Sequence, residues 1–309
     1  MEKVFGTSYL VADITKMHGG AQKAVYKIDC TNGFSCVLYV WDMTMNYFQE
    51  EITNNHLHAQ SFGSDLFELN NKYLIEHSIR TPALYDLNKE RIRYSFDYAL
   101  VEYVAGQTAE AYFTHSDSRV KDNVFQQLGE MITGMHANER SIYGKPHHSG
   151  NNTEPCHLLQ LEHAKIQLSY ASEYMDGIRE NQTKLLDTLL ELESSIKPRS
   201  RYGFIHGELG PNHVLVTPAL EPYLIDIEGA EFFDIEHEHS FLEFRFEEFY
   251  RYLKNDKLDP NRMLFYKFHH HISLIAAGLK LIHRGYPDQQ LARNIADYHT
   301  VCALRFVEG

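Results

Sequence analysis

The chain has 309 residues, of which 43% are hydrophobic and 13% aromatic, and its formal net charge at pH 7 is −13. That composition is typical of a globular chain able to bury a sizeable core, and the length suits one large domain or two ordinary ones. The acidic balance argues against nucleic acid or an anionic membrane as the principal partner, since both are bound through clustered Lys and Arg. A cationic ligand is a better match.

The sequence favours a cytoplasmic protein. Its N-terminus lacks a basic stretch followed by an apolar one, and no run of about 18 apolar residues occurs. The four cysteines form neither a CxxC pair nor a disulfide-scaffold spacing. We therefore expect free thiols at Cys30, Cys36, Cys156 and Cys302, and the oligomeric state stays open.

Two apolar-rich segments near the N-terminus, Val25–Ile28 and Cys36–Trp41, flank the turn signal Asn32-Gly33. They predict a hairpin, and a two-residue turn at that signal would place Cys30 opposite Ser35.

A glycine pair, Gly19 and Gly20, precedes the first of these strands. A glycine turn can bring backbone amides close to phosphate groups, which makes both residues candidates for nucleotide binding. An ordinary tight turn explains the same pair.

A helix is predicted from the N-cap signal Ser64-Asp65 up to Pro82, with Glu68 in its first turn. Two strand-like runs follow, Arg91–Phe96 and Tyr98–Val104. The second runs straight into Ala105-Gly106 and so leaves backbone amide and carbonyl groups free at its end. An adenine ring can be bound by such groups without side chains, so Glu102, Tyr103 and Val104 are candidates for the purine site.

Beyond Gly106 the pattern changes from strands to helices. Apolar residues at helical spacing predict helices around Val124–Met135 and over Leu158–Ile178, Thr183–Ile196, Phe241–Leu253, Met263–Arg284 and Gln289–Phe306. The sequence therefore predicts an α+β, bilobal protein: a nucleotide-binding N-lobe over residues 1–105, and a helical C-lobe over residues 106–309.

The stretch Phe204–Asp226, FIHGELGPNHVLVTPALEPYLID, carries the clearest chemical signal. Val214–Val216 and Tyr223–Ile225 flank a Pro-containing turn, which predicts a small hairpin with a polar loop on each side. One loop carries Glu208 and the other ends at Asp226. Two such carboxylates can converge on a metal-phosphate site, as phosphoryl transfer requires.

With these segments together, the sequence resembles the aminoglycoside phosphotransferase and choline kinase-like family, which has the protein-kinase-like fold. The resemblance rests on the glycine-turn hairpin, the segment VEYVAG, the helix LGEMITGMHA, and the loops HGEL and LIDIEGAEFFD. It implies a C-lobe with the catalytic loop, the metal aspartate and the acceptor site.

The family's first loop reads HGDxxxxN, and the resemblance assigns the residues of both loops by position. His206 matches the histidine, Glu208 stands where the family has its catalytic base, and His213 stands where an Mg²⁺-binding Asn is expected. Asn212 is next to it and is a second candidate. Asp226 matches the family's principal Mg²⁺ ligand.

One further family residue is replaced. The strand lysine that contacts the nucleotide phosphates should fall in CVLYVW, where Tyr39 appears. Glu68 resembles the helix glutamate that pairs with that lysine, so its partner is expected to be Lys27 or Lys23.

Two histidine-rich segments allow other readings. Asp234–His239, DIEHEH, can ligate Zn²⁺ in principle, but it lacks the H-E-x-x-H spacing and suits an acidic, partly solvated loop better. His269, His270 and His271 fall in a helical pattern. Consecutive residues do not share a helix face, so a joint metal site is not expected.

The predicted function is an ATP- or GTP-dependent phosphotransferase that uses Mg²⁺ and phosphorylates a hydroxyl of a small, amine-bearing molecule, either aminoglycoside-like or an amino-metabolite. Acidic side chains between Asp234 and Glu248 would attract the amine. The alternative is a catalytically degenerate, kinase-like nucleotide-binding or scaffold protein, which the replaced lysine, base and asparagine favour. The retained His206 and Asp226 argue for the enzyme.

Overall fold

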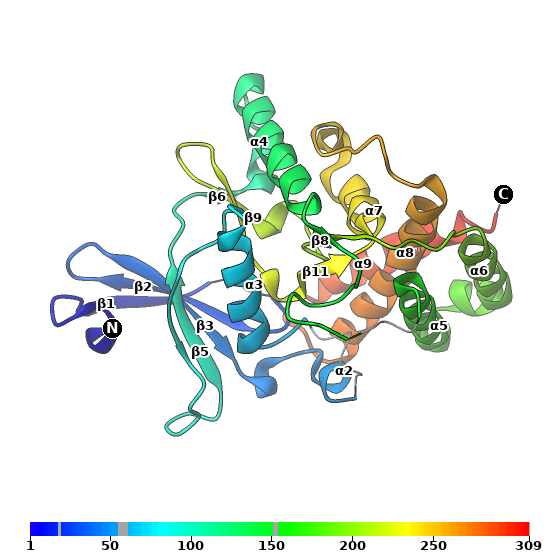
Figure 1. Cartoon of the computed structure of the whole chain (residues 1–309). Helices are drawn as coiled ribbons and strands as arrows, with labels where there is room; N and C mark the ends of the chain where they lie inside the picture. Colours follow the sequence, from blue (N-terminus) through cyan, green and yellow to red (C-terminus); the bar gives the residue numbers. More distant parts are fainter. Residues whose placement is uncertain (18–19, 55–60, 151–153, 309) are drawn as a thin grey trace. The chain divides into compact units, whose positions relative to one another are not determined.

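The computed structural model describes residues 1–17, 20–54, 61–150 and 154–308, and it divides into two compact units. The first unit comprises Met1–Met135 and Gly210–Ala230, and the second comprises His136–Leu209 and Glu231–Gly309. The predicted α+β class, with a β-rich N-terminal region and a helical C-terminal region, is confirmed (Figure 1). The sequence placed the boundary after residue 105, whereas the first compact unit also takes in residues 106–135 and the hairpin segment 210–230.

The first unit contains a five-stranded antiparallel sheet in the order β1-β2-β3-β5-β4. Its strands are β1 Val11–Lys16, β2 Ala24–Cys30, β3 Ser35–Trp41, β4 Leu84–Asn88 and β5 Asp97–Glu102. Burial deepens from β1, which is exposed along its whole length, to β3, where Cys36 and Trp41 are buried. The core of this unit therefore lies against β3 and β5.

The β2–β3 hairpin forms as predicted, but its register differs by one residue. Ser35 lies opposite Asp29, not Cys30. The loop has three residues because Gly33 adopts a left-handed φ of 84°, and the amide of Cys30 bonds to the carbonyl of Phe34 at 2.8 Å. A type I turn followed by a left-handed glycine is the usual three-residue hairpin loop.

The strand predicted over Arg91–Phe96 is wrong, because residues 92–96 form bends and the strand before β5 is β4. Arg91 has a positive φ of 50° and its guanidinium pairs with Asp97 at 2.7 Å. That conformation is incompatible with a strand.

The first unit also contains four helices and four 3-10 turns among its described residues. They are α1 Glu2–Phe5, α2 Gln49–Asn54, α3 Ser64–Glu76 and α4 Ser118–His136, with 3-10 turns η1 Met43–Met45, η2 Ala109–Tyr112, η3 Pro211–His213 and η4 Ile227–Gly229. Helix α3 ends at Glu76, before the predicted limit at Pro82. Its Phe67 ring lies 5.4 Å from the Tyr39 ring and 5.5 Å from that of Trp41, which fastens the helix to β3.

The predicted hairpin of the central stretch is confirmed as β9 Val214–Val216 and β10 Pro222–Leu224. A short strand, β6 Gln107–Thr108, adds to β9. At Gly106, just before β6, an added Cβ would lie 1.9 Å from the carbonyl oxygen of Val216, and its φ is +152°. Only glycine allows the chain to pass so close to β9.

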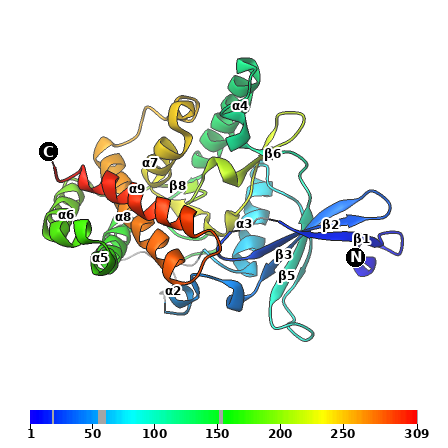
Figure 2. The same ribbon diagram turned by 180° about the vertical axis from the view of Figure 1, so that it is seen from behind.

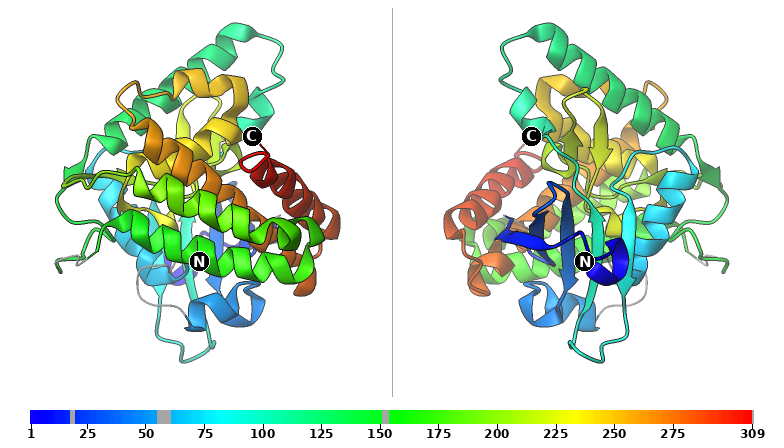
Figure 3. Two further views of the ribbon diagram at one scale, coloured as in Figure 1. Left: turned by 90° about the vertical axis from the view of Figure 1, so that its right-hand side faces the viewer. Right: turned by 90° about the vertical axis from the view of Figure 1, so that its left-hand side faces the viewer.

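The second unit has a three-stranded sheet in the order β11-β8-β7, with β7 Glu139–Arg140, β8 Tyr202–Ile205 and β11 Glu231–Phe233. Its helices are α5 Cys156–Tyr174, α6 Asp176–Ser194, α7 Ile235–Phe246, α8 Pro260–His283 and α9 Gln289–Leu304, with the 3-10 helix η5 Glu247–Tyr252. Figure 2 shows α8 beside α9, and the left view of Figure 3 shows α5 and α6 side by side.

Helix α8 is the centre of the second unit because it contacts α5, α6, α7 and α9. Its start is well defined: Pro260 occupies the first turn, and the Asp259 carboxylate accepts hydrogen bonds from the amides of Asn261 and Arg262. Each helix predicted in this region has a counterpart, but α6 begins at Asp176 rather than Thr183, and α7 begins at Ile235 rather than Phe241. The last part of the predicted Phe241–Leu253 helix is the 3-10 helix η5.

All four cysteines are free, as predicted. Within the described residues, no helix is long and apolar enough to cross a membrane.

Candidate active site

Asp226 follows β10 directly and has a left-handed backbone conformation, with φ 62° and ψ 46°. A residue other than glycine pays an energetic penalty in this region, and such residues gather at functional sites. The backbone turn points the carboxylate outward, so that 41% of the side chain is exposed. The residue predicted as the metal ligand is thus both held in an unusual conformation and accessible.

Lys23 is the cation beside Asp226. Its Nζ lies 2.6 Å from Oδ1 of Asp226 and 2.5 Å from Oε1 of Glu228, and only 8% of its side chain is exposed. Burial by itself lowers the pKa of Lys23, but the two carboxylates outweigh it and raise the pKa above its usual value. The lysine is therefore charged at every physiological pH.

Glu228 fixes the other end of this ion pair. It is buried, and its Oε1 also accepts a hydrogen bond from the indole of Trp41 at 3.1 Å. The side-chain amide of Asn70 in α3 donates to the main-chain carbonyls of Ile227 and Glu228 at 2.8 and 3.2 Å. Helix α3 and strand β3 together hold the turn that carries Asp226.

His213 approaches the other oxygen of the Asp226 carboxylate, with Nε2 3.5 Å from Oδ2. Its carbonyl accepts the amide of Ile225 at 3.0 Å, which ties η3 to the residue before Asp226. Asn212 belongs to the same 3-10 turn. The structure thus brings His213 and Asp226 together, as the sequence pattern suggested for the metal ligands.

The expected partner of Glu68 is wrong. Glu68 pairs with Lys89 at 2.6 Å, while Lys27 pairs with Asp29 at 2.8 Å and Lys23 is engaged by Asp226. Lys27 lies in β2, four residues after Lys23. Its ammonium group lies over the Tyr103 ring, 4.6 Å from the ring centre. The sequence named Lys23 only as an alternative partner for Glu68 and missed its contact with Asp226.

Tyr39 stands where the resemblance places the strand lysine, so another residue supplies the positive charge here. The ring of Tyr39 is buried between Trp41 and Phe67, and burial raises its pKa to about 12, so the phenol stays neutral. The Nζ of Lys23 lies 5.1 Å from the centre of this ring. Lys23, from just before the neighbouring strand β2, brings the positive charge to the place beside Tyr39.

The glycine pair before β2 is only partly described. Gly19 lies outside the described residues, and Gly20 is exposed with open space around its Cα.

The segment predicted to bind the purine, Glu102–Val104, has two distinct parts. The amide of Glu102 bonds to the carbonyl of Ala83 at 2.8 Å, and its carboxylate accepts the amide of Ala83 at 3.1 Å. Glu102 therefore ties β5 to the residue before β4 and offers no amide to a ligand. The main-chain amides of Tyr103 and Val104 have no hydrogen-bond partner among the described residues.

In the second unit, the loop after β8 carries His206, Gly207 and Glu208. The amides of His206 and Gly207 donate to Oε1 of Glu238 at 2.9 and 3.0 Å, and Nε2 of His136 lies 2.6 Å from Oε2 of the same carboxylate. Burial alone raises the pKa of Glu238, but the bond from His136 and its charge lower it below the usual value. A buried, ionised glutamate thus fixes this loop.

The loop presents its two candidate catalytic residues differently. His206 is buried, with 1% exposed surface, and its Nδ1 lies 3.4 Å from the amide of Glu208. Gly207 has a φ of 90°, which turns the chain so that Glu208 is exposed. The carboxylate of Glu208 is accessible, whereas the His206 ring is part of the core.

The acidic segment Asp234–His239 is not the partly solvated loop that the sequence predicted. Residues 235–239 form the first turns of α7, and Asp234, Glu236 and Glu238 are all buried. Arg199 pairs with Glu236 at 2.8 Å, and Arg262 and the hydroxyl of Tyr266 contact Asp234. Each carboxylate has a structural partner, so none of the three attracts a ligand by its charge.

The acids farther along the chain are nearer the surface. Glu243 pairs with Lys267 at 3.0 Å, and Glu247 and Glu248 are exposed. Of the acidic side chains predicted to attract an amine, these three glutamates are the ones near the surface.

The β-rich unit carries an exposed aspartate beside a buried lysine, and the helical unit carries an exposed glutamate on a fixed loop. Both features are compatible with a kinase-like fold. The model of the phosphotransferase enzyme family matches residues 71–238, which is 168 of the 309 residues. The chain belongs to this family, and the predicted enzyme class, a small-molecule phosphotransferase with an alcohol group as acceptor, is confirmed. No sequence match to a curated protein was found.

Solved structures of similar fold agree with this assignment. A thermostable mutant of aminoglycoside phosphotransferase APH(4)-Ia in its apo form has a TM-score of 0.67 at 17% identity, and 97% of each chain is covered. A putative aminoglycoside phosphotransferase from Ralstonia eutropha JMP134 has a TM-score of 0.65 at 13% identity, covering 99% of this chain and 94% of that one. Spectinomycin phosphotransferase APH(9)-Ia, in complex with ADP and spectinomycin, has a TM-score of 0.62 at 14% identity, covering 96% and 93%. Similarity at these identities shows a shared fold.

Proposed function

We propose that the protein transfers the γ-phosphoryl group of ATP or GTP to a hydroxyl of a small, amine-bearing molecule. The observation that carries this proposal is the exposed carboxylate of Asp226, held in a left-handed turn between the buried Lys23 and His213. Phosphoryl transfer depends on positioning and on charge around the phosphates, and this cluster supplies both signs of charge.

The residues around Asp226 fit Mg²⁺. This ion prefers oxygen ligands and usually keeps several waters, so one accessible carboxylate is enough protein to hold it beside a nucleotide. Asp226 is the principal ligand in this proposal, with Asn212 or His213 secondary, and the amide oxygen of Asn212 is the harder donor of the two. Mg²⁺ held there would supply positive charge to neutralise the phosphates of the nucleotide.

Lys23 takes the place of the strand lysine that Tyr39 displaces. Its ammonium group is held at the Asp226 carboxylate without a nucleotide, and it is charged at every pH at which the enzyme would work. A phosphate oxygen is a good acceptor for that ammonium. Lys27 and Glu68 were the expected nucleotide-binding pair, but their ion pairs with Asp29 and Lys89 favour Lys23 instead.

The purine site is proposed at Tyr103 and Val104. A strand end with unbonded amides is a suitable binding edge for a purine ring, and Val104 is buried there. Glu102 fixes the geometry of this segment through its two bonds to Ala83. The backbone near Gly20 is a second candidate for contacts to phosphate.

Glu208 is proposed as the base that orients the acceptor hydroxyl. Its carboxylate is exposed on a loop whose amides are fixed by Glu238. A base of this kind works mainly by placement, so a fixed loop with an exposed carboxylate is well suited to it. His206 contributes by shaping that loop.

Two observations support an amine-bearing acceptor. The net charge is −13, which attracts cations at long range. Structures of similar fold were solved with AMP-PNP and hygromycin B, and with ADP and spectinomycin. The buried acids of α7 are ion-paired, so the attraction rests on exposed carboxylates such as Glu247 and Glu248.

A thermal-shift titration with ATP and with GTP, each with and without Mg²⁺, tests the proposal first. A nucleotide that binds the folded chain raises Tm as its concentration rises, and the preferred one does so at the lower concentration. A screen for nucleotide turnover with amine-bearing antibiotics and metabolites then identifies the acceptor class. No shift at millimolar concentrations of either nucleotide with Mg²⁺ would overturn the proposal.

A further inference from the structure

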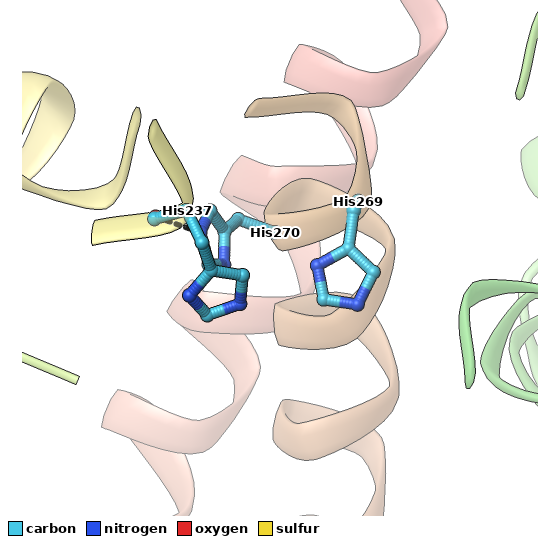
Figure 4. Close-up of side chains that lie close together, drawn as sticks. All are labelled: His237, His269 and His270. Atoms are coloured by element: carbon cyan, nitrogen blue, oxygen red, sulfur yellow. Dashed lines mark hydrogen bonds between the residues drawn. The ribbon is translucent and has the colours of Figure 1, made fainter. Parts of the chain in front are cut away.

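Three imidazole rings gather inside the second unit, apart from the residues proposed for phosphoryl transfer. His237 comes from α7, and His269 and His270 come from α8 (Figure 4). Each ring offers a nitrogen, and these three nitrogens lie within 4.8 Å of one another. The ring centres of His237 and His270 are 4.5 Å apart.

The sequence did not lead us to expect this cluster, because consecutive residues on a helix point about 100° apart. His269 and His270 nevertheless both lie close to His237. The His237 ring comes from the neighbouring helix α7 and lies between the directions in which the other two rings point. The third consecutive histidine, His271, points elsewhere, and its Nδ1 lies 2.9 Å from Nδ1 of His299.

The cluster has buried nitrogens that nothing satisfies. Nδ1 of His237 and Nδ1 of His269 are buried and have no hydrogen-bond partner among the described residues. Buried polar atoms in proteins are almost always bonded, and an exception calls for an explanation such as an ion. Two buried, unbonded nitrogens thus belong to the rings of one three-histidine cluster, and a bound ion would account for the cluster.

The His270 ring is already oriented as a metal ligand would be. Nε2 of His270 lies 2.8 Å from the main-chain carbonyl of His237. Histidines that bind metals usually donate their other ring N–H to a carbonyl or carboxylate, which fixes the tautomer and the ring plane.

We propose that His237, His269 and His270 bind one Zn²⁺ or a similar transition-metal ion. Three imidazoles are the donor set that Zn²⁺, Co²⁺ and Ni²⁺ accept, whereas Mg²⁺ and Ca²⁺ require oxygen. Zn–N bonds of about 2.0–2.1 Å in a tetrahedron place ligand nitrogens roughly 3.3 Å apart, so the rings close in by small rotations. A water takes the fourth position.

The ion would cross-link α7 to α8 within the second unit. The residue after His237 is Glu238, whose carboxylate holds the amides of the His206–Gly207 loop. The metal therefore strengthens the helix turn from which that loop is fixed.

The test uses the untagged full-length protein, stripped with EDTA, desalted, loaded with ZnCl₂ and desalted again. We expect about one equivalent of zinc per chain by elemental analysis and a rise in Tm with Zn²⁺ but not with Mg²⁺. Co²⁺ in place of Zn²⁺ is expected to give the visible absorption bands of a tetrahedral site.

His237→Gln and His269→Gln each remove one ligand and should lose the retained equivalent, the Co²⁺ bands and the Tm response to Zn²⁺. The matched control is His271→Gln, which replaces a similarly buried histidine on α8. This variant should keep the retained equivalent, the Co²⁺ bands and the Tm response to Zn²⁺. The metal-free Tm of each variant shows whether it folds. X-ray absorption of the zinc-loaded wild type reports the ligands without any substitution, and three imidazoles are expected.

Absence of a retained equivalent in the wild type overturns the proposal. So does retention of the equivalent by a folded His237→Gln or His269→Gln protein, or an absorption spectrum without imidazole ligands. None of these outcomes bears on nucleotide binding at Asp226, because the two sites share no residue.

Discussion

Lys23 is the residue on which the most chemistry converges, because its ammonium group joins a buried carboxylate to an exposed one. Lys23→Met should lower phosphoryl-transfer activity by about 10²-fold or more, the usual loss when a charged donor to the reacting group is removed. It should also destabilise the chain by about 3–5 kcal/mol, since Glu228 is left buried without its cation. Urea unfolding and steady-state turnover measure the two effects.

The double variant Lys23→Met/Glu228→Gln separates these roles. Replacing the unpaired carboxylate by an amide should restore much of the stability but none of the activity. A double variant that regains full turnover would show that Lys23 serves the fold alone.

Glu208 is the second residue with a specific expectation. Glu208→Gln keeps the shape of the side chain and removes its charge, so turnover should fall by about 10²–10⁴-fold, as for the loss of a general base. Nucleotide affinity, measured by titration, should change little. Full activity of Glu208→Gln with the true acceptor would refute the assignment of the base.

Glu208→Asp tests the placement of the carboxylate. The loop is fixed by Glu238, so a shorter side chain cannot be compensated by backbone movement, and turnover should fall as well.

At this scale the sequence predicted residues better than it predicted their pairings. The resemblance to the two loops of the family singled out Asp226 and His213, which do lie together. The pairing of Lys23 with Glu228 joins residues 205 positions apart, and no local pattern shows such a contact. The D-x-E spacing of Asp226 and Glu228 was visible in the sequence and was the one available signal.

Among the secondary-structure elements, the approach of β6 to β9 depends on a single glycine. Gly106→Ala would place a Cβ 1.9 Å from the Val216 carbonyl oxygen at a φ of +152°. We expect a loss of about 1–3 kcal/mol in the free energy of unfolding, the usual cost of overpacking. Urea denaturation measures it.

Gly134→Ala in α4 is the control for that substitution. A Cβ at Gly134 meets nothing within 4 Å, and alanine is the better helix former, so this change should stabilise the chain by about 0.5–1 kcal/mol. Equal effects of both substitutions would argue against a close approach at Gly106.

Local patterns predicted the helices and strands whose apolar residues are periodic. They failed where residues distant in the sequence determine whether a segment is buried. The helices of the second unit and both hairpins were visible from apolar spacing and turn residues. The segment at the start of α7 looked like a solvated loop because its acids are charged. Their partners, Arg199, Arg262 and His136, lie far away in the sequence, and only the folded chain reveals that they neutralise a buried helix.

For the molecule as a whole, buried histidines set the dependence of stability on pH. Burial lowers the pKa of His239 and His271 to about 3 and that of His299 to about 4, from an ordinary value of 6.5. Below pH 6.5 the unfolded chain binds protons that the folded chain does not, so the free energy of unfolding falls as the pH falls. Each such histidine contributes up to about 1.4 kcal/mol per pH unit until its folded pKa is reached.

Urea denaturation of the EDTA-treated protein at pH 7.5, 6.0 and 5.0 measures this effect. Stability should be nearly constant above pH 7 and should fall steeply between pH 6 and pH 5. A flat profile across that range would mean that these rings take up protons in the folded chain as readily as in the unfolded chain.

Composition was sufficient to predict a globular chain, because globularity follows from bulk burial. The α+β class required the change from strand to helix patterning, and the enzyme class required the two loops and the family resemblance. The division of the chain was harder to predict. Residues 210–230 pack with the N-terminal unit although they follow the helices of the second unit in sequence, and no boundary signal marks the exchange.

The central claim is that this chain is a phosphotransferase whose nucleotide site depends on a metal held by Asp226. Asp226→Asn tests it most directly, because asparagine has the same shape and tolerates the left-handed backbone of this position. The measurement is the shift in Tm with ATP or GTP, with and without Mg²⁺, for the wild type and the variant. The account predicts that the variant folds with a Tm near that of the wild type and loses the Mg²⁺-dependent part of the shift. A Mg²⁺-dependent shift of the same size in Asp226→Asn would contradict the account.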